Sequence, residues 1–255
     1  MDDIRLENLG SGVTAVISRE HGFGTDALLL ADFAAPAVTD KCCDLGTGCG
    51  IIPLLWCRKE NEHPIAAVEI SEKACAQLGQ AAEISGLSDR IRIFNRDIRD
   101  IKEFLPAGAF DVVTMNPPYK AQGAGIVSSG DAAAVARHGL MCSLEDMCRA
   151  ASWLVRFGGR FCVCLRPERL CELMCCMRDF GMEPKRLRTV SKRDGSAPWL
   201  VLVEGKRGAK PGMTVEPQLN VYSSDSTYSE YMCALYADYE KEREANISRR
   251  KEEDL

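Results

Sequence analysis

Apolar and polar positions along the chain follow two periods that alternate from segment to segment. Short apolar runs rich in β-branched residues predict buried strands, and runs with a repeat of three to four residues predict amphipathic helices. Strands are expected at 12–20, 41–46, 65–70, 90–94, 110–116, 159–165, 184–191 and 198–205. Helices are expected at 25–34, 50–60, 71–85, 143–156 and 168–180.

Local signals mark several helix ends. Thr25 or Asp26 is expected to cap the first helix, and Ser143 to cap the helix at 143–156. Pro53 fits the first turn of the second helix, and Gly86 is expected to end the third. The boundaries therefore agree with the hydrophobic pattern.

The alternation of strands and helices predicts an α/β fold with a mainly parallel sheet and helices on both faces. The last two strands have no helix between them, so they are expected to form an antiparallel hairpin at one edge. One domain is expected over 1–235, with a strand and helix extension at 1–40. Residues 236–255 mix both charges and predict a helix or a tail, and the Gly-, Ala- and Ser-rich segment 120–138 predicts a lid.

Composition restricts the class of protein. The 255 residues are 46% hydrophobic and 27% charged, as in a globular protein with a buried core. No apolar run approaches the roughly 18 residues of a membrane-spanning helix. The acidic first residues lack the apolar core of a signal peptide, which predicts a cytoplasmic protein.

Thirteen cysteines raise the question of metal binding. Cys42 and Cys43 are adjacent, and Cys162 and Cys164 alternate along an expected strand. There is no C-x-x-C pair, and the three histidines are scattered. These spacings predict buried, reduced thiols and no metal site.

The segment CCDLGTGCGIIPLL places a glycine-rich turn between a strand and a helix. Gly46, Gly48 and Gly50 allow a ligand to approach the backbone, and Glu69 ends the next strand, where it can accept bonds from both ribose hydroxyls. The spacing G-x-G-x-G departs from the dinucleotide pattern. Asp44 would repel a pyrophosphate but suits the cationic amino end of a methionine moiety.

Asp97 follows the third of these strands, where its carboxylate is suited to accept a hydrogen bond from an adenine amino group. The segment now resembles class I S-adenosylmethionine-dependent methyltransferases, with DLGTGCG as their first motif, Glu69 as the second and Asp97–Ile98 as the third. This resemblance implies a Rossmann-like fold with a seven-stranded sheet and S-adenosylmethionine as cofactor. The expected cofactor site consists of Thr25, Asp26, Asp44, Gly46, Thr47, Gly48, Gly50, Glu69, Ile70, Asp97, Ile98 and Asn116.

The tetrapeptide NPPY, residues 116–119, follows an apolar strand at the edge where a doubly wound sheet binds ligands. An adenine amino group is a poor nucleophile, because its lone pair is delocalised into the ring. The side-chain carbonyl of Asn116 and the backbone carbonyl of Pro117 can accept its two N–H bonds and raise its nucleophilicity. Pro118 limits backbone freedom, and Tyr119 offers a ring for stacking. These four residues are the expected catalytic set.

Further segments narrow the resemblance. FGTDALLLADFA, ARHG, RPERL, EPKRLRTV and KPGMTVEPQLNVY together resemble the bacterial tRNA1(Val) (adenine(37)-N6)-methyltransferase family over residues 5–235. The resemblance implies transfer of a methyl group to N6 of adenosine 37 in tRNA(Val). The protein is expected to be a monomer. One departure is Gly139, where the family pattern suggests an acid after Arg137–His138.

The net charge of −5 conceals a basic region. Between Ala151 and Val215, thirteen Lys and Arg stand against six Asp and Glu, which gives a local charge of +7. A solvated face is the simplest explanation, but tRNA phosphates require such a region. The expected substrate-binding residues are Tyr119, Lys120, Arg137, His138, Lys185, Arg186, Arg188, Lys192 and Arg193.

Other functions remain open at this point. A glutamine-N5 methyltransferase of release factors shares NPPY, but such proteins carry a longer helical N-terminal domain. A DNA or ribosomal RNA base methyltransferase would need a target-recognition domain that the sequence does not show. A non-catalytic RNA-binding module is a third alternative, and failure to bind the cofactor would favour it.

Overall fold

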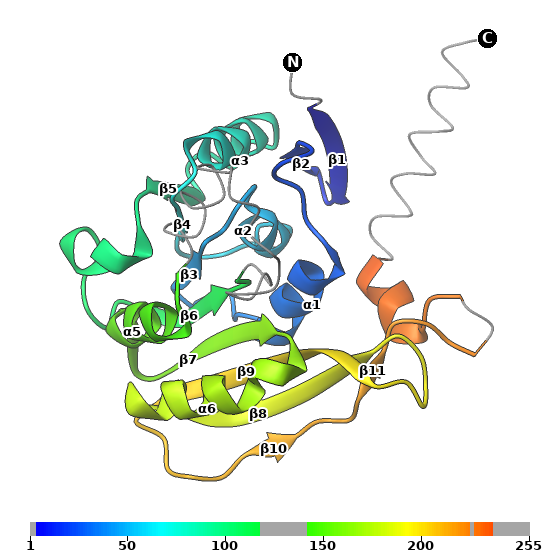
Figure 1. Cartoon of the computed structure of the whole chain (residues 1–255). Coiled ribbons are helices and arrows are strands. Elements are labelled where there is room, and N and C mark those ends of the chain that lie inside the picture. Colours follow the sequence, from blue (N-terminus) through cyan, green and yellow to red (C-terminus); the bar gives the residue numbers. More distant parts are fainter. Residues whose placement is uncertain (1–3, 118–141, 225–226, 237–255) are drawn as a thin grey trace, which may run out of the picture.

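The computed structural model describes residues 4–117, 142–224 and 227–236 of the chain. Its centre is a sheet with the strand order β10-β8-β9-β7-β6-β3-β4-β5, and β11 also pairs with β8 (Figure 1). Five neighbouring strands are parallel. They are β3 (Cys42–Leu45), β4 (Ile65–Glu69), β5 (Ile91–Asn95), β6 (Phe110–Met115) and β7 (Val155–Leu165).

The remaining strands extend the sheet beyond β7. Strand β9 (Pro198–Arg207) lies between β7 and β8 (Met182–Ser191) and is antiparallel to both. The two-residue strands β10 (Thr214–Val215) and β11 (Leu219–Asn220) run parallel to β8. The predicted antiparallel pair is confirmed, and the seven longer strands are joined by two short ones that the sequence pattern did not predict.

Two layers of helices cover the sheet (Figure 1). On one face, α1 (Thr25–Ala34), α2 (Ile51–Trp56) and α3 (Glu72–Ile84) share a core with Cys42 and Val112. On the other face, α5 (Leu144–Leu154) and α6 (Leu170–Asp179) share a core with Cys43 and Val113. Successive residues of β3 and β6 therefore enter opposite cores, as the pleat of a strand requires. The 3-10 helices η1 (Ile98–Glu103) and η2 (Pro167–Arg169) and a short helix at 230–236 complete the described helical segments.

A hairpin of β1 (Arg5–Gly10) and β2 (Val13–Ile17) forms a separate two-stranded sheet beside α3 (Figure 1). The Thr14 backbone N–H donates to Ser85 Oγ at 2.9 Å, and Gln77 Nε2 donates to the Val16 carbonyl at 3.3 Å. Because these bonds join the hairpin to α3, the first strands are part of the folded body.

Helix ends follow the predicted signals in part. Ser71 and Ser143 cap α3 and α5, and Ser143 forms a reciprocal capping box with Asp146. The expectation for α1 is wrong, because its N-cap is Gly24 and no side chain caps it. Helix α2 ends at Trp56 rather than residue 60. The Arg90 guanidinium there donates to the carbonyls of Cys57 and Lys59, which do not continue the helix.

The expected helix at 168–180 is divided into η2 and α6. Pro167 begins the first piece, where its fixed φ suits a helical start. Leu173 and Met177 of α6 are buried, while Cys171 and Cys175 are exposed on its outer face. Burial of every thiol is therefore a wrong expectation, although all thirteen cysteines are free.

A chain of ion pairs crosses the outer part of the sheet. Arg186 Nη1 lies 2.7 Å from Glu204 Oε2, and its Nε lies 2.7 Å from Glu216 Oε1. Arg188 Nε is 3.1 Å from Glu216 Oε2, and Arg160 Nη1 is 3.4 Å from Glu204 Oε2. Three arginines from β7 and β8 thus share two glutamates.

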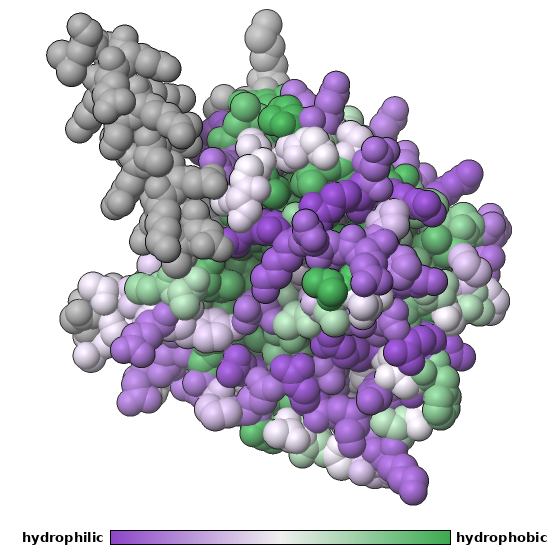
Figure 2. All heavy atoms as spheres, turned by 180° about the vertical axis from the view of Figure 1, so that it is seen from behind, coloured by the Kyte–Doolittle hydropathy of each residue, from purple (hydrophilic) through white to green (hydrophobic). Residues whose placement is uncertain are grey.

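The surface seen from behind is mostly hydrophilic, and the apolar side chains visible there lie in small separate patches (Figure 2). Among the described residues, no helix combines the length and the apolar character needed to cross a membrane. The expected lid and charged tail lie largely or wholly outside the described residues.

Candidate active site

The glycine turn after β3 is tied to the end of β4. The Gly48 N–H donates to Glu69 Oε2 at 2.9 Å, and the Ser71 N–H donates to Glu69 Oε1 at 2.8 Å. A Cβ on Gly48 would meet no atom of the described residues within 4 Å, so they leave open space beside its backbone. A Cβ on Gly50 would lie 2.1 Å from Leu78 Cδ1, which shows that this glycine permits close packing of α3. Gly48 therefore leaves room beside the backbone, whereas Gly50 allows α3 to pack closely against the turn.

Asp44 is buried beneath this turn, with 1% of its surface exposed. Thr114 Oγ1 on β6 donates to Asp44 Oδ1 at 2.7 Å. Burial raises the pKa of the carboxyl to about 7, while the hydroxyls of Thr47 and Thr114 oppose the shift. The buried Thr47 Oγ1 has no hydrogen-bond partner of good geometry among the described residues. The turn therefore places a buried hydroxyl beside a carboxyl that can change its charge.

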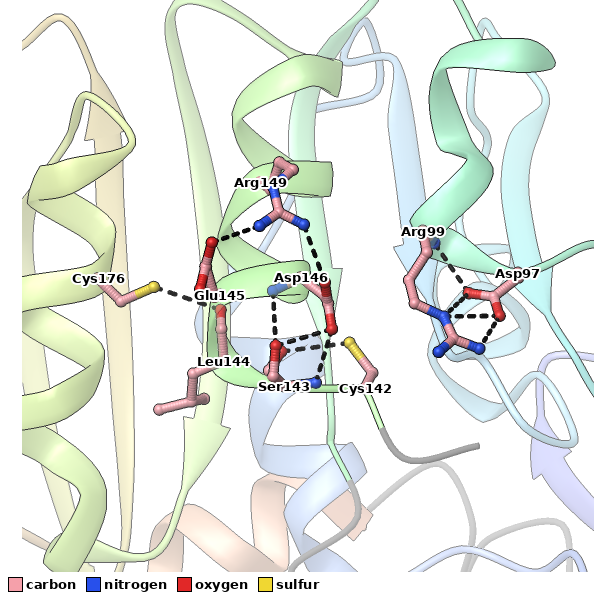
Figure 3. A network of polar contacts seen from close by, with 9 residues as sticks. All are labelled: Asp97, Arg99, Cys142, Ser143, Leu144, Glu145, Asp146, Arg149 and Cys176. Carbon is pink, nitrogen blue, oxygen red and sulfur yellow. Dashed lines mark hydrogen bonds and ion pairs between the residues drawn. The ribbon is translucent and has the colours of Figure 1, made fainter. Parts of the chain in front are cut away.

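Asp97 follows β5 and caps η1 (Figure 3). Its carboxylate accepts the Arg99 backbone N–H at 2.9 Å and binds the Arg99 guanidinium through Nε and Nη2. These bonds to Arg99 lower the pKa of Asp97. The carboxylate is in the predicted place but already has a cationic partner, so an adenine amino group would have to share it with Arg99.

Asn116 follows β6, and its amide is held on both sides. Its Nδ2 donates to Asp26 Oδ2 at 3.3 Å, while its Oδ1 accepts the Cys164 thiol at 3.1 Å. Asp26 lies in the first turn of α1 and also accepts the Ala27 N–H at 3.0 Å. A carboxylate only accepts hydrogen bonds, so this contact fixes which end of the amide is the carbonyl. The sequence did not predict the contacts of Asn116 with Asp26 and Cys164.

The carboxyl ends of parallel strands share one edge of the sheet, and most of the expected cofactor site lies there. Asp44, Glu69 and Asp97 lie at or after the ends of β3, β4 and β5, which are neighbours in the sheet. Ile70 is exposed next to Glu69, and Ile98 is buried. The structure therefore brings together the residues that the glycine turn and the strand ends predicted.

The expected substrate residues divide into three groups. Tyr119, Lys120, Arg137 and His138 lie outside the described residues, as does Pro118 of the expected catalytic set. Arg186 and Arg188 have the intramolecular ion pairs described above, and Lys185 Nζ donates to the Lys210 carbonyl at 3.1 Å. Lys192 and Arg193 are exposed in the loop after β8. Because β8 and β7 point in the same direction, this loop lies at the carboxyl edge of the sheet.

Comparison with known proteins agrees with this geometry. Residues 14–136 match the family model described as methyltransferase small domain. A tRNA1(Val) (adenine(37)-N6)-methyltransferase of Tolumonas auensis is 29% identical over 83% of this chain and 86% of its own. Another from Histophilus somni is 30% identical over 85% of this chain and 89% of its own. The chain belongs to the tRNA1(Val) (adenine(37)-N6)-methyltransferase family.

Membership of this family confirms the predictions of a methyltransferase and of S-adenosylmethionine as its cofactor. A solved structure of a predicted O-methyltransferase from Agrobacterium tumefaciens superposes with a TM-score of 0.66. That chain is 20% identical, and the match covers 84% of this chain and 96% of the other. This likeness confirms the Rossmann-like methyltransferase fold.

The residues present fit S-adenosylmethionine. The space beside Gly48 admits a ligand to the backbone, and the buried Thr47 hydroxyl lies at the same turn. Glu69 retains acceptor capacity on both oxygens after its two backbone bonds, since a carboxylate has about four acceptor positions. Asp44 supplies a carboxyl whose ionised form a cationic ligand would stabilise.

Proposed function

We propose that this enzyme methylates N6 of adenosine 37 in tRNA(Val), as a monomer in the cytoplasm. The observation that carries the proposal is the orientation of Asn116, whose carbonyl is turned away from Asp26 at the carboxyl end of β6. Its relatives of about 30% identity, which span most of the chain, are named for this reaction. Together they support an adenine amino group as the methyl acceptor.

The chain's part in the reaction is to hold and polarise the amino group. Asn116 Oδ1 and the Pro117 carbonyl accept its two N–H bonds, which favours a pyramidal nitrogen with an available lone pair. S-adenosylmethionine, when bound, supplies an electrophilic methyl group. The adenine nitrogen forms the new bond to carbon while the carbon–sulfur bond breaks. The methylated nitrogen is then cationic and releases a proton to water, so no strong base is required.

The test is methylation of an unmodified tRNA(Val) transcript with labelled S-adenosylmethionine, followed by digestion and mapping of the labelled nucleoside. We expect N6-methyladenosine at position 37. Asn116→Ala should lower the rate by roughly 10²–10³, while the cofactor dissociation constant stays within about threefold. Label in another nucleoside, or in a release factor supplied in place of RNA, would contradict the proposal.

A further inference from the structure

Arg166 directly follows β7, close to the residue of β7 that contacts Asn116. The Cys164 thiol donates to Asn116 Oδ1 at 3.1 Å. Arg166 is the N-cap of η2, and its φ of −68° and ψ of 141° continue the extended backbone of the strand. Because side chains alternate between the two faces, Arg166 lies on the same face as Cys164, about 7 Å farther along the chain. Its exposed side chain is therefore at the carboxyl edge of the sheet, on the side where Asn116 lies.

Trp199 determines the orientation of the Arg166 side chain. Arg166 Nη1 donates to the Trp199 carbonyl at 3.0 Å, and the guanidinium carbon lies 5.5 Å from the centroid of the Trp199 ring. Trp199 belongs to β9, the antiparallel neighbour of β7, and it packs against the core that contains Cys164. A hydrogen bond and a cation–π contact with the same residue restrict a long side chain. Arg166 therefore loses less conformational entropy when it binds a ligand.

A guanidinium held at this edge has the chemistry to bind an RNA phosphate. Its planar N–H groups match phosphate oxygens, and the bond to the Trp199 carbonyl uses one of its five donors. A base that enters a methyltransferase pocket must leave the stack of its own loop. The phosphates on either side of that nucleotide stay outside the pocket, at the edge where Arg166 is exposed. A cation there can hold the backbone while the base lies in the site.

We propose that Arg166, oriented by Trp199, binds a phosphate next to the target adenosine and so holds the extruded nucleotide over Asn116. The inference rests on the proposed function and adds to it a residue for the RNA backbone. Arg166 follows β7, which is the direct neighbour of β6, whereas the loop with Lys192 and Arg193 follows β8, two strands farther out. Its contact is therefore local to the target nucleotide.

The same segment supplies a matched control for the test. Arg169 lies three residues farther along, and its guanidinium donates to both oxygens of Glu172, at 3.0 and 2.9 Å. Arg166→Met and Arg169→Met each remove one positive charge, but only the first removes the cation above Trp199. We expect Arg166→Met to raise KM for a tRNA(Val) transcript about tenfold. Its slope of log affinity against log salt should fall by about 0.7–0.9. Cofactor binding should not change, and Arg169→Met should behave as the wild type.

Neutral linkages in the RNA identify the phosphate. Ligation yields tRNA(Val) with a single methylphosphonate on one side or the other of position 37. At one of these two linkages, the wild type should lose the same factor in KM that Arg166→Met loses on unmodified tRNA. The variant should lose nothing more there. Losses that multiply at both linkages would show that Arg166 acts only on the fold, and they would overturn the contact.

Two further outcomes separate the contact from the reaction. An unchanged KM and salt slope for Arg166→Met would overturn the contact and leave the proposed function intact. Failure of the wild type to methylate N6 of adenosine 37 in unmodified tRNA(Val) would instead overturn the proposed function and, with it, the contact.

Discussion

Asn116 owes its orientation to residues from two distant segments of the chain. Asp26 lies 90 positions before it and Cys164 lies 48 positions after it. Without a carboxylate at Asp26, the amide could rotate and present its NH₂ group where the carbonyl is needed. We therefore expect Asp26 to act on the reaction through Asn116, while its role as a cofactor ligand stays a prediction from the sequence.

We expect Asp26→Asn to lower kcat by roughly 10- to 100-fold, since a misplaced reacting group commonly costs about that much. The cofactor dissociation constant should change by less than about threefold. Asp32→Asn, on the same helix but bonded to Tyr231, is the matched control. Steady-state kinetics and calorimetry distinguish positioning of Asn116 from binding of the cofactor. Weaker cofactor binding with a normal kcat would show that Asp26 binds the cofactor.

Asp44 makes the free enzyme sensitive to pH. Its folded pKa of about 7 lies above the ordinary value of 3.8, so between these values the folded state holds a proton that the unfolded state has lost. The contribution of Asp44 to the free energy of unfolding therefore falls as pH rises from about 4 to about 7. A cationic cofactor favours the ionised carboxyl and should release that proton on binding.

We predict that the affinity for S-adenosylmethionine rises between pH 6 and pH 8 and that binding near pH 7 releases close to one proton. Calorimetry in buffers of different ionisation enthalpy measures this number. Asp44→Asn keeps an acceptor for Thr114 but cannot ionise, so its proton release should be near zero. An equal release from the variant would assign the proton to another group.

The turn between β3 and α2 shows which features of the elements can be predicted from the sequence. The glycine spacing and the acids at strand ends are local, and they placed Asp44, Gly48 and Glu69 at one edge of the sheet. The hydrophobic pattern could not predict the bond between Arg99 and Asp97 or the early end of α2 at Trp56. Both depend on contacts between particular side chains, which a periodic pattern does not encode. The paired strands at 184–191 and 198–205 were predictable, whereas the two-residue strands were too short to have a pattern.

The same turn gives a prediction that separates binding from stability. Both Gly48 and Gly50 have positive φ, so alanine at either site carries a backbone strain of about 1–2 kcal/mol. Gly50→Ala also collides with Leu78, and overpacking adds roughly 1–3 kcal/mol. Gly48→Ala meets only open space, where the cofactor is expected.

We therefore expect Gly50→Ala to lower the midpoint of thermal unfolding by several degrees more than Gly48→Ala does. Gly48→Ala should weaken S-adenosylmethionine binding at least tenfold while most of its stability remains. Thermal melts with and without cofactor, together with calorimetry, provide both quantities. A reversed order of the two melting temperatures would contradict the assigned roles.

For the whole molecule, the basic region is less available than its local charge suggests. Arg186 and Arg188 form ion pairs with Glu204 and Glu216. Their contact with tRNA phosphates stays a prediction, because the phosphates would have to compete with these glutamates. Charge reversal at either arginine would place an acid beside these glutamates and destabilise the fold. Lys192 and Arg193 offer a clearer test of how an acidic protein binds RNA.

We predict that Lys192→Ala with Arg193→Ala weakens tRNA binding and leaves cofactor binding unchanged. The slope of log affinity against log salt should fall by about 0.7–0.9 for each phosphate contact removed. Filter binding over a range of salt concentrations measures the slope. Lys59→Ala with Lys102→Ala, in the bend after α2 and in η1, is the control for total charge. An unchanged slope in the loop variant would place the phosphate contacts elsewhere.

The position of β9 between β7 and β8 has a consequence for synthesis. Domains begin to fold while the chain leaves the ribosome, from the N-terminus onward. The strands that carry the expected cofactor-site acids emerge first, but β7 and β8 are not hydrogen-bonded to each other and need the later β9 to join them. Until residues 198–207 emerge, each has an open edge that can pair with other chains. The nascent enzyme therefore passes through a stage in which the glycine turn is present but β7 and β8 still lack their shared partner strand. This stage ends when β9 emerges and pairs with both.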